Sequence, residues 1–246
     1  MPDPVLIEIG FLTIRWYGVL IAAAVLIGTL LALREIRKKG IDEDTFMNIL
    51  LVCIPVGLIS ARLYYVLFNW GYFGQNPDKI FAVWEGGLAI HGGIIGSFVV
   101  GWFMVKYYQI NFLDVADAVA PSFILGQAIG RWGNYFNQEA YGYAVDPEKV
   151  PWAMFIDGAY RHPTFLYEFI WNILIFAALL LIREKIKPKP GILFAVYIGG
   201  YSAGRFVIES FRTDSLMFAS LRAAQVTSII MIIFAAGLAY YLYRKE

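Results

Sequence analysis

The residues of this chain best suited to chemistry lie between Gly126 and Gly142, in the segment GQAIGRWGNYFNQEAYG. The segment begins at the end of an apolar run and finishes as a polar, aromatic loop. Arg131 and the polar residues after it are therefore expected where a helix leaves a membrane. An arginine at the centre of a spanning helix costs about 2.5 to 3.5 kcal/mol, so it normally has a partner or a task. The simpler interpretation is that Arg131 only pairs with Glu139 and that the glycines only pack helices.

A second polar group occurs in the apolar run near residue 205. Arg205, Glu209 and Arg212 are spaced i, i+4 and i+7, so they share one face of a helix, and Tyr201 lies one turn earlier. An Arg–Glu–Arg pairing within the helix would explain the spacing without any ligand. A binding site would explain why such costly groups recur in apolar surroundings.

Further polar side chains are expected at a similar depth on other helices, namely Tyr17, Arg62 and His91. Scattered structural ion pairs have no reason to share one level, whereas a ligand site built between helices does. The arginines outnumber the acidic residues expected near them, with Arg62, Arg131, Arg205 and Arg212 against Glu139, Glu168 and Glu209. This excess predicts an anionic ligand, since guanidinium groups bind phosphate oxygens in a bidentate manner. In a membrane, the abundant anion of this kind is a phospholipid headgroup.

The two histidines lead to different expectations. His91 precedes two glycines, a pattern typical of helix packing, but a histidine can also act as a general base near neutral pH. His162 comes just before Pro163 and Thr164, where a helix is expected to begin, which favours a capping role.

The elements that must position these residues are membrane-spanning helices. The chain has 246 residues, 59% of them hydrophobic, and its apolar runs repeatedly approach the roughly 20 residues that cross a bilayer. We predict about seven spans, at roughly 14–34, 45–68, 87–106, 115–133, 165–183, 191–211 and 221–243.

Charge between the spans predicts the orientation. Short basic segments follow the first, third, fifth and seventh spans, and the positive-inside rule therefore places the N-terminus outside and the C-terminus in the cytoplasm. The expected fold is an all-α polytopic membrane protein, with residues 1–246 as a single integral membrane domain. Residues 134–163, between spans four and five, are expected to form a small external head. The aromatic segment after Asn69 is expected to lie at the membrane interface.

Several classes of function are disfavoured. The single cysteine, Cys53, lies in an apolar run, so neither an internal disulfide nor a cysteine metal site is possible. No metal-ligand cluster, nucleotide-binding loop or basic tract occurs in the sequence, which predicts no cofactor and no nucleic-acid partner. The first residues lack a basic region, so no cleaved signal peptide is expected.

Motifs along nearly the whole chain resemble the bacterial prolipoprotein diacylglyceryl transferase family. The central stretch matches the family signature GRxGNFxNxExxG, with Tyr135 where phenylalanine is usual, and Ile90 stands where the family often has phenylalanine. The matching segments are RWYG at 15–18, ARLYYVLFN at 61–69, WEGGLAIHGGIIG at 84–96, GRWGNYFNQEAYG at 130–142, HPTFLYE at 162–168 and YSAGRFVIESFR at 201–212.

The resemblance implies transfer of the diacylglyceryl group from phosphatidylglycerol to the lipobox cysteine of preprolipoproteins, with release of glycerol 1-phosphate, at the outer side of the bacterial inner membrane. It implies that Arg131 binds phosphatidylglycerol. Other residues at positions that matter for activity in the family are Tyr17, His91, Asn134, Glu139, Gly142 and Arg205.

The chemistry of this reaction suggests roles. His91 is the candidate base for the thiol, unless the arginine field alone generates thiolate. Arg131 and Arg205 are expected to neutralise the leaving phosphate, and Tyr17, Asn134 and Asn137 to orient the headgroup. Residues expected to complete the substrate site are Glu139, Gly142, Tyr201, Glu209, Arg212 and Arg62.

Two other classes remain open at this stage. A transporter or channel would place charged groups at several depths. A lipid-binding scaffold would bind phosphatidylglycerol and consume none.

Overall fold

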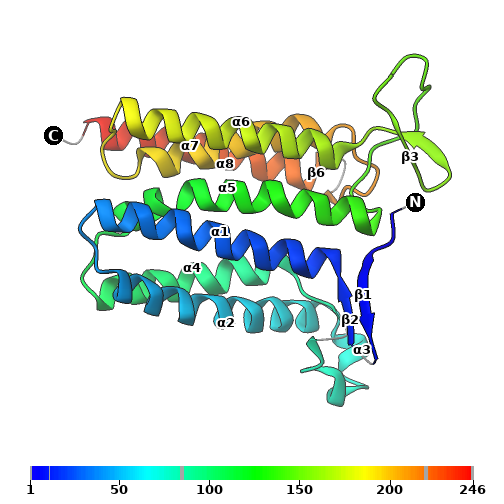
Figure 1. The fold of residues 1–246 in the computed structure, drawn as a ribbon, viewed down its shortest axis with the longest axis horizontal. Coiled ribbons are helices and arrows are strands. Elements are labelled where there is room, and N and C mark those ends of the chain that lie inside the picture. Colours follow the sequence, from blue (N-terminus) through cyan, green and yellow to red (C-terminus); the bar gives the residue numbers. More distant parts are fainter. Residues whose placement is uncertain (1, 11, 84–85, 219–220, 245–246) are drawn as a thin grey trace. The chain divides into compact units, whose positions relative to one another are not determined.

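Helices long enough to cross a membrane make up most of the structure, a computed structural model that describes residues 2–10, 12–83, 86–218 and 221–244 (Figure 1). Among the described residues, seven helices meet the length and apolar composition of membrane spans. They are α1 (Trp16–Lys38), α2 (Glu43–Phe68), α4 (Ile90–Tyr107), α5 (Phe112–Asn137), α6 (Thr164–Lys185), α7 (Ile192–Glu209) and α8 (Ala223–Arg244). The prediction of an all-α polytopic membrane protein with about seven spans is thus confirmed.

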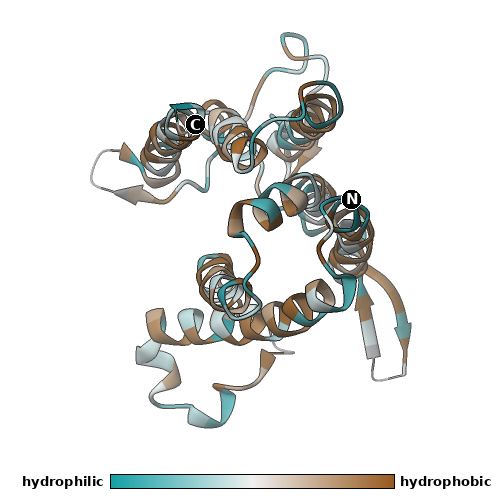
Figure 2. Cartoon of the chain, turned by 90° about the vertical axis from the view of Figure 1, so that its left-hand side faces the viewer, coloured by the Kyte–Doolittle hydropathy of each residue, from teal (hydrophilic) through white to brown (hydrophobic). Residues whose placement is uncertain are grey.

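Apolar side chains cover the surfaces of these helices, as expected for contact with lipid. Leu26, Leu51 and Ile233 are each more than 60% exposed, although all three lie within spans. Figure 2 shows hydrophobic residues along the long helices and hydrophilic residues mainly at helix ends and in connecting segments.

The main departure from the predicted spans is the length of α5, which continues to Asn137. Asn134 and Asn137 therefore lie within the last turn of the helix and not in a loop beyond it, and Arg131 lies inside the span as predicted. Aromatic packing supports this extension, because Trp16 stacks on Phe136 with ring centroids 4.7 Å apart and Tyr135 packs beside Phe165 at 5.3 Å.

Three short antiparallel hairpins occur outside the spans and were not predicted. They are β1 (Val5–Ile9) with β2 (Leu12–Arg15), β3 (Met154–Ile156) with β4 (Ala159–Arg161), and β5 (Met217–Phe218) with β6 (Leu221–Arg222). The second hairpin lies within the expected external head, with Phe155 opposite Tyr160. A short helix α3 (Trp70–Phe73) and a 3₁₀ turn (Pro77–Lys79) follow α2.

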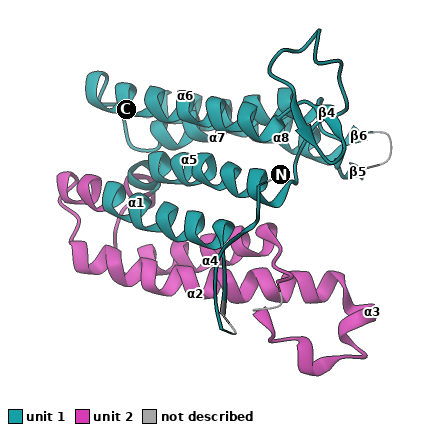
Figure 3. Ribbon diagram, turned by 45° about the vertical axis from the view of Figure 1, so that its right-hand side comes forward, with its two compact units in different colours: residues 1–32, 116–246 teal, residues 33–115 magenta. Residues whose placement is uncertain are grey.

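The chain divides into two units (Figure 3). Unit 1 comprises Met1–Ala32 and Ala116–Glu246, and unit 2 comprises Leu33–Val115. The expectation of one integral membrane domain with an external head at 134–163 stays a prediction.

Buried polar contacts join the helices of unit 1. Asp117 in α5 is 2% exposed and accepts hydrogen bonds of 2.8 Å from the backbone amides of Gly191 and Phe194, so it caps the beginning of α7 from a neighbouring helix. The Ser122 hydroxyl in α5 donates to the Gly28 carbonyl in α1 at 2.7 Å. In the same unit, a buried apolar cluster is formed by Ile124 of α5, Leu179 of α6 and Leu193 of α7.

In unit 2, α2 and α4 meet through small residues. A Cβ atom added at Gly92 or Gly96 would overlap Ser60, and one at Gly57 would overlap Ser97. Gly92 and Gly96 of this motif thus serve close helix packing, as the simpler interpretation expects, whereas an added Cβ at Gly93 would make only ordinary contact. At the beginning of α2, the Thr45 amide and hydroxyl donate to the Asp42 carboxylate, which lowers the pKa of Asp42.

Candidate active site

The centre of the site is Glu168, a carboxylate in α6 that contacts three guanidinium groups. Its side chain is only 3% exposed. The Oε1 atom accepts hydrogen bonds from Arg205 Nη1 at 2.7 Å and Arg212 Nη1 at 3.4 Å, and Oε2 pairs with Arg131 Nη2. Arg131 from α5 and Arg205 from α7 therefore meet at one anion, as the hypothesis of a shared site requires.

Each arginine from the α7 region has a second acidic partner. Arg205 Nη2 lies 2.7 Å from Glu209 Oε2, one turn further along α7. Arg212 donates from Nε at 2.9 Å and from Nη2 at 2.6 Å to the two oxygens of Asp214. We refer to Arg131, Arg205, Arg212, Glu168 and Glu209 as the arginine cluster.

The Arg212–Asp214 pair shifts the pKa of both groups. Burial by itself raises the pKa of the Asp214 carboxyl, but the hydrogen bonds and the charge of Arg212, together with a backbone hydrogen bond and the charge of Arg205, outweigh burial and hold this pKa below its ordinary value. Burial likewise lowers the pKa of Arg212, and Asp214 together with the charges of Glu168 and Glu209 more than offsets it. Both groups are therefore charged at neutral pH.

Asn134 extends the network to the end of α5. Its Oδ1 accepts from Arg131 Nη1 at 3.3 Å, and its Nδ2 donates to Glu139 Oε1 at 2.9 Å. Asn137 donates to the same carboxylate oxygen at 3.3 Å. The expected ion pair between Arg131 and Glu139 is replaced by the pair with Glu168, and Glu139 reaches Arg131 only through Asn134.

Tyr17 lies against α5 at Gly133. A Cβ atom at this position would overlap the Tyr17 ring, so the glycine is required for the ring to approach the helix. At Gly126 and Gly130 an added Cβ would be 3.9 Å from Ala24 and Ile21, respectively, which is ordinary contact. Of the three glycines expected to admit a neighbour, only Gly133 is needed for it.

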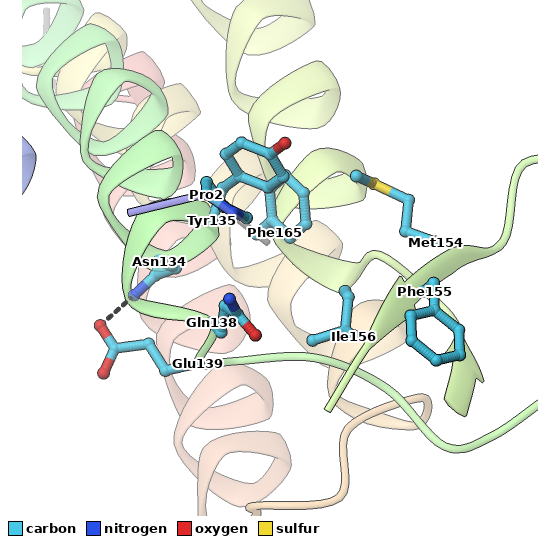
Figure 4. A pocket seen from close by; sticks show the side chains of 9 residues that line it. All are labelled: Pro2, Asn134, Tyr135, Gln138, Glu139, Met154, Phe155, Ile156 and Phe165. Atoms are coloured by element: carbon cyan, nitrogen blue, oxygen red, sulfur yellow. Dashed lines mark hydrogen bonds between the residues drawn. The ribbon is translucent and has the colours of Figure 1, made fainter. Parts of the chain in front are cut away.

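A pocket of about 360 Å³ opens beside the end of α5 (Figure 4). Figure 4 shows Asn134 hydrogen-bonded to Glu139 on one side and aromatic and aliphatic side chains on the other. The lining residues are Pro2, Asn134, Tyr135, Gln138, Glu139, Met154, Phe155, Ile156 and Phe165. Its lining does not include the cluster arginines, so the pocket adjoins the polar network through Asn134 and Glu139 only.

Gly142 and Tyr201 both pack closely against other residues of unit 1. Gly142 is buried where two segments cross, and an added Cβ would come within 2.7 Å of the His162 Cβ and of the Phe211 carbonyl oxygen. Tyr201 packs against the buried apolar cluster, with its ring 6.4 Å from that of Tyr197. A direct contact of either residue with substrate stays a prediction.

Arg62 belongs to unit 2, where backbone carbonyls occupy its guanidinium. It is 5% exposed and donates to the carbonyl oxygens of Ile80 at 2.9 Å, Lys79 at 2.7 Å, Gly86 at 2.6 Å and Gly87 at 3.0 Å. These bonds fix the segment after α3. Four of the five N–H groups of Arg62 therefore already have acceptors, which supports a structural role for this residue. Its expected role in ligand binding stays a prediction.

His91 also belongs to unit 2 and lies in the first turn of α4. Its side chain is exposed, and its ring centroid is 6.3 Å from that of Tyr64. Its role as a base stays a prediction.

His162 does not cap α6, contrary to expectation. Pro163 is the N-cap residue of α6, without a side-chain capping bond, and Thr164 donates to the Ala140 carbonyl. The His162 Nδ1 atom lies 2.8 Å from the Tyr167 hydroxyl, and burial lowers the pKa of its imidazole.

Two residues of this polar network were not predicted as site residues from the sequence. Glu168 was considered only as a possible counter-charge, although a glutamate inside an apolar helix is itself a signal of function. Arg222 from β6 donates to the carbonyls of Glu209 and, at 3.1 Å, Arg212, and thus satisfies the carboxyl end of α7. No spacing in the sequence connects Arg222 with α7.

Charge in this network is balanced, whereas the sequence predicted a cationic excess. That excess counted Arg62, which belongs to unit 2, and included neither Arg222 nor Asp214. In the network, four guanidinium groups accompany four carboxylates, those of Arg131, Arg205, Arg212, Arg222, Glu139, Glu168, Glu209 and Asp214.

The arrangement suits the binding of an anion to guanidinium groups away from bulk water, where electrostatic interactions are strong. Arg131, Arg205 and Arg212 are only 11–20% exposed. Within the described ranges, no group of three histidine, cysteine, aspartate or glutamate residues could hold a metal ion.

Comparison with known proteins identifies a family for the chain. A family model described as prolipoprotein diacylglyceryl transferase matches residues 4–241. Similar proteins named phosphatidylglycerol–prolipoprotein diacylglyceryl transferase occur in Clostridium novyi (50% identity, covering 94% of this chain and 92% of the relative) and Clostridioides difficile (49%, covering 99% and 97%). A protein of the same name from Bacillus licheniformis is 46% identical, covering 97% of this chain and 92% of the relative.

Proposed function

The chain belongs to the prolipoprotein diacylglyceryl transferase family, and from this we propose that it transfers a diacylglyceryl group from phosphatidylglycerol to the lipobox cysteine of a preprolipoprotein. This is the first step of lipoprotein maturation. The single structural observation that supports it is the arginine cluster, in which guanidinium groups from two regions of the fold converge on one buried carboxylate.

The reaction is a displacement at carbon. The cysteine sulfur bonds to C3 of the diacylglycerol moiety, the bond from that carbon to the phosphate oxygen breaks, and glycerol 1-phosphate departs with the electron pair. The thiol proton passes to a base. Negative charge grows on the phosphate as it leaves, so cations placed beside it lower the barrier.

Arg131 and Arg205 are the residues we assign to the phosphate. Both are mostly buried, and their paired N–H groups suit phosphate oxygens. Arg212 and Glu209 would orient Arg205. Asn134, Asn137 and Tyr17 would orient the headgroup glycerol, with Glu139 holding the two asparagines.

The nucleophile needs a thiolate, because a free cysteine with a pKa near 8.5 is mostly protonated at neutral pH. We assign His91 as the base. A pH–rate profile of His91→Gln tests this assignment: the acidic limb should disappear together with most of the activity. Retained activity with an unchanged acidic limb would instead assign thiolate formation to the field of the arginines.

The site is proposed to face the outside of the bacterial inner membrane, where secreted preprolipoproteins emerge. The basic residues in the last turns of α1, α4, α6 and α8 support an external N-terminus and a cytoplasmic C-terminus. Residues 134–163 would then form the external head, beside which the pocket lies. No cofactor and no nucleic acid take part in this proposal.

Incubation of the purified protein with phosphatidylglycerol and a lipobox peptide tests the function. The peptide should gain the mass of one diacylglyceryl group, and EDTA should not prevent the gain. A peptide with serine in place of the cysteine should gain nothing. Lipid binding without transfer would refute the proposal and indicate a scaffold, and ion flux in proteoliposomes would indicate a transporter.

A further inference from the structure

The arginine cluster already contains an anion, namely the Glu168 carboxylate. One of its oxygens contacts Arg205 and Arg212, and the other pairs with Arg131. A phosphate that binds Arg131 Nη2 and Arg205 Nη1 would take the same N–H groups. The carboxylate and the phosphate therefore compete for these donors.

A buried donor that could receive the displaced carboxylate lies one turn further along α6. Asn172 is 1% exposed, and within the described part of the chain its Nδ2 atom has no hydrogen-bond partner. Asn172 follows Glu168 by four residues, so both side chains lie on one face of the helix. An unpaired buried donor costs about 1–3 kcal/mol, which a carboxylate turned toward it would recover.

We propose that Glu168 is a resident anion that holds the three guanidinium groups in position until the lipid phosphate replaces it, and that Asn172 then receives its carboxylate. The proposal rests on the proposed function for the identity of the phosphate. It makes Glu168 and Asn172 positioning residues, since neither needs to touch the reacting atoms.

Exchange of anions predicts opposite effects of two substitutions. Glu168→Gln removes the competing charge, so phosphatidylglycerol should bind about tenfold more tightly, as expected when a binding-competent state rises from a minor to the main population. The same change loosens the arginines, so kcat should fall by about 10- to 100-fold. Asn172→Leu removes the receiving donor, so lipid binding should weaken.

A charge-matched control separates competition from net charge. Glu209 is as buried as Glu168, but it approaches only Arg205 closely and lies 4.0 Å from Arg212. Glu209→Gln should therefore change lipid affinity less than Glu168→Gln does. An equal gain in both variants would overturn the proposal in favour of a simple effect of charge.

The experiment measures equilibrium binding of phosphatidylglycerol in mixed detergent micelles without peptide, with phosphatidylethanolamine as the zwitterionic reference, and then kcat and KM with a lipobox peptide. Weaker or unchanged phosphatidylglycerol binding by Glu168→Gln would overturn the proposal, as would tighter binding by Asn172→Leu. A purely structural role would lower the yield of folded protein and leave the affinity of the folded fraction unchanged.

If Glu168→Gln does not fold, Glu168→Asp provides the same test. Its shorter side chain cannot reach all three guanidinium groups, so lipid affinity should rise and kcat should fall. Unchanged or weaker binding would again overturn the proposal. Because binding is measured without peptide, failure of transfer by the unmodified protein would refute the proposed function and leave the anion exchange to be judged by lipid affinity alone.

Discussion

Replacement of Gly133 by alanine should separate the positioning of Tyr17 from helix stability. Alanine favours a helix by about 0.8–1 kcal/mol over glycine. At this position the new methyl group would overlap the Tyr17 ring, including atoms close to its attachment point, so the whole side chain must move. Overpacking of this kind costs about 1–3 kcal/mol, which leaves a net loss of about 0–2 kcal/mol.

Activity should suffer more than stability. Displacement of a positioning group by about 1 Å can cost about 100-fold in rate, so kcat for diacylglyceryl transfer should fall by about that factor. Gly126→Ala is the matched control in the same helix, where the added methyl group meets only Ala24 at 3.9 Å. It should retain full activity and raise the melting temperature by about 2–4 °C.

The assay is peptide transfer at saturating phosphatidylglycerol, together with thermal unfolding in detergent. A double-mutant cycle completes it: in a Tyr17→Ala background there is no ring to displace, so Gly133→Ala should cause little further loss. If the two losses multiply instead, the reasoning that Gly133 acts through Tyr17 is refuted.

Three further predictions concern other parts of the molecule. Arg131→Gln should lower kcat/KM by about 100- to 1,000-fold, the loss typical of removing one charge-stabilising donor. Arg131→Lys should restore only a part of the activity, because lysine cannot bind phosphate in a bidentate manner. A lysine variant as active as the unmodified protein would contradict this. Arg62→Met should lower the free energy of unfolding by about 3 kcal/mol or more, because it leaves several carbonyl groups without a donor. An unchanged melting curve would count against the structural role of Arg62. Burial lowers the pKa of the His162 imidazole, so the unfolded state takes up a proton at this residue first as pH falls below about 6.5, and stability should fall from pH 7 to pH 5. His162→Gln should flatten the dependence of melting temperature on pH. An unaltered slope would exclude His162 as the source of that dependence.

The sequence was sufficient to predict the spans, because an apolar run of about 20 residues has few alternatives in a bilayer. It also singled out Arg131 and Arg205 as candidate site residues, since an arginine within an apolar run is costly wherever the helices lie. The spacing also predicted the pair of Arg205 with Glu209 one turn along the helix, which the structure shows. What it could not predict was the partner on another helix. Arg131 has Glu139 nearby in sequence, but in the fold its partner is Glu168 on another helix.

The partners of Arg62 were likewise not predictable from the sequence. Its sequence context resembles that of a ligand-binding arginine, and only the path of the segment after α3 shows that carbonyl groups occupy its donors. Periodicity reports which face of a helix is polar, and not what approaches that face. The short hairpins were missed for a related reason, since strands of two to five residues carry too little pattern to distinguish them from loops.

The cap that Asp117 places on α7 restricts how unit 1 can open. Asp117 ties α5 to the first turn of α7, a hydrogen bond from Gln127 to Tyr197 joins the two helices further along, and Glu168 bridges their arginines near the other end. Parting α5 from α7 would break all three connections at once. A two-tailed lipid is therefore expected to enter and leave between other helices, and a cross-link that locks α5 to α7 should be tolerated during turnover.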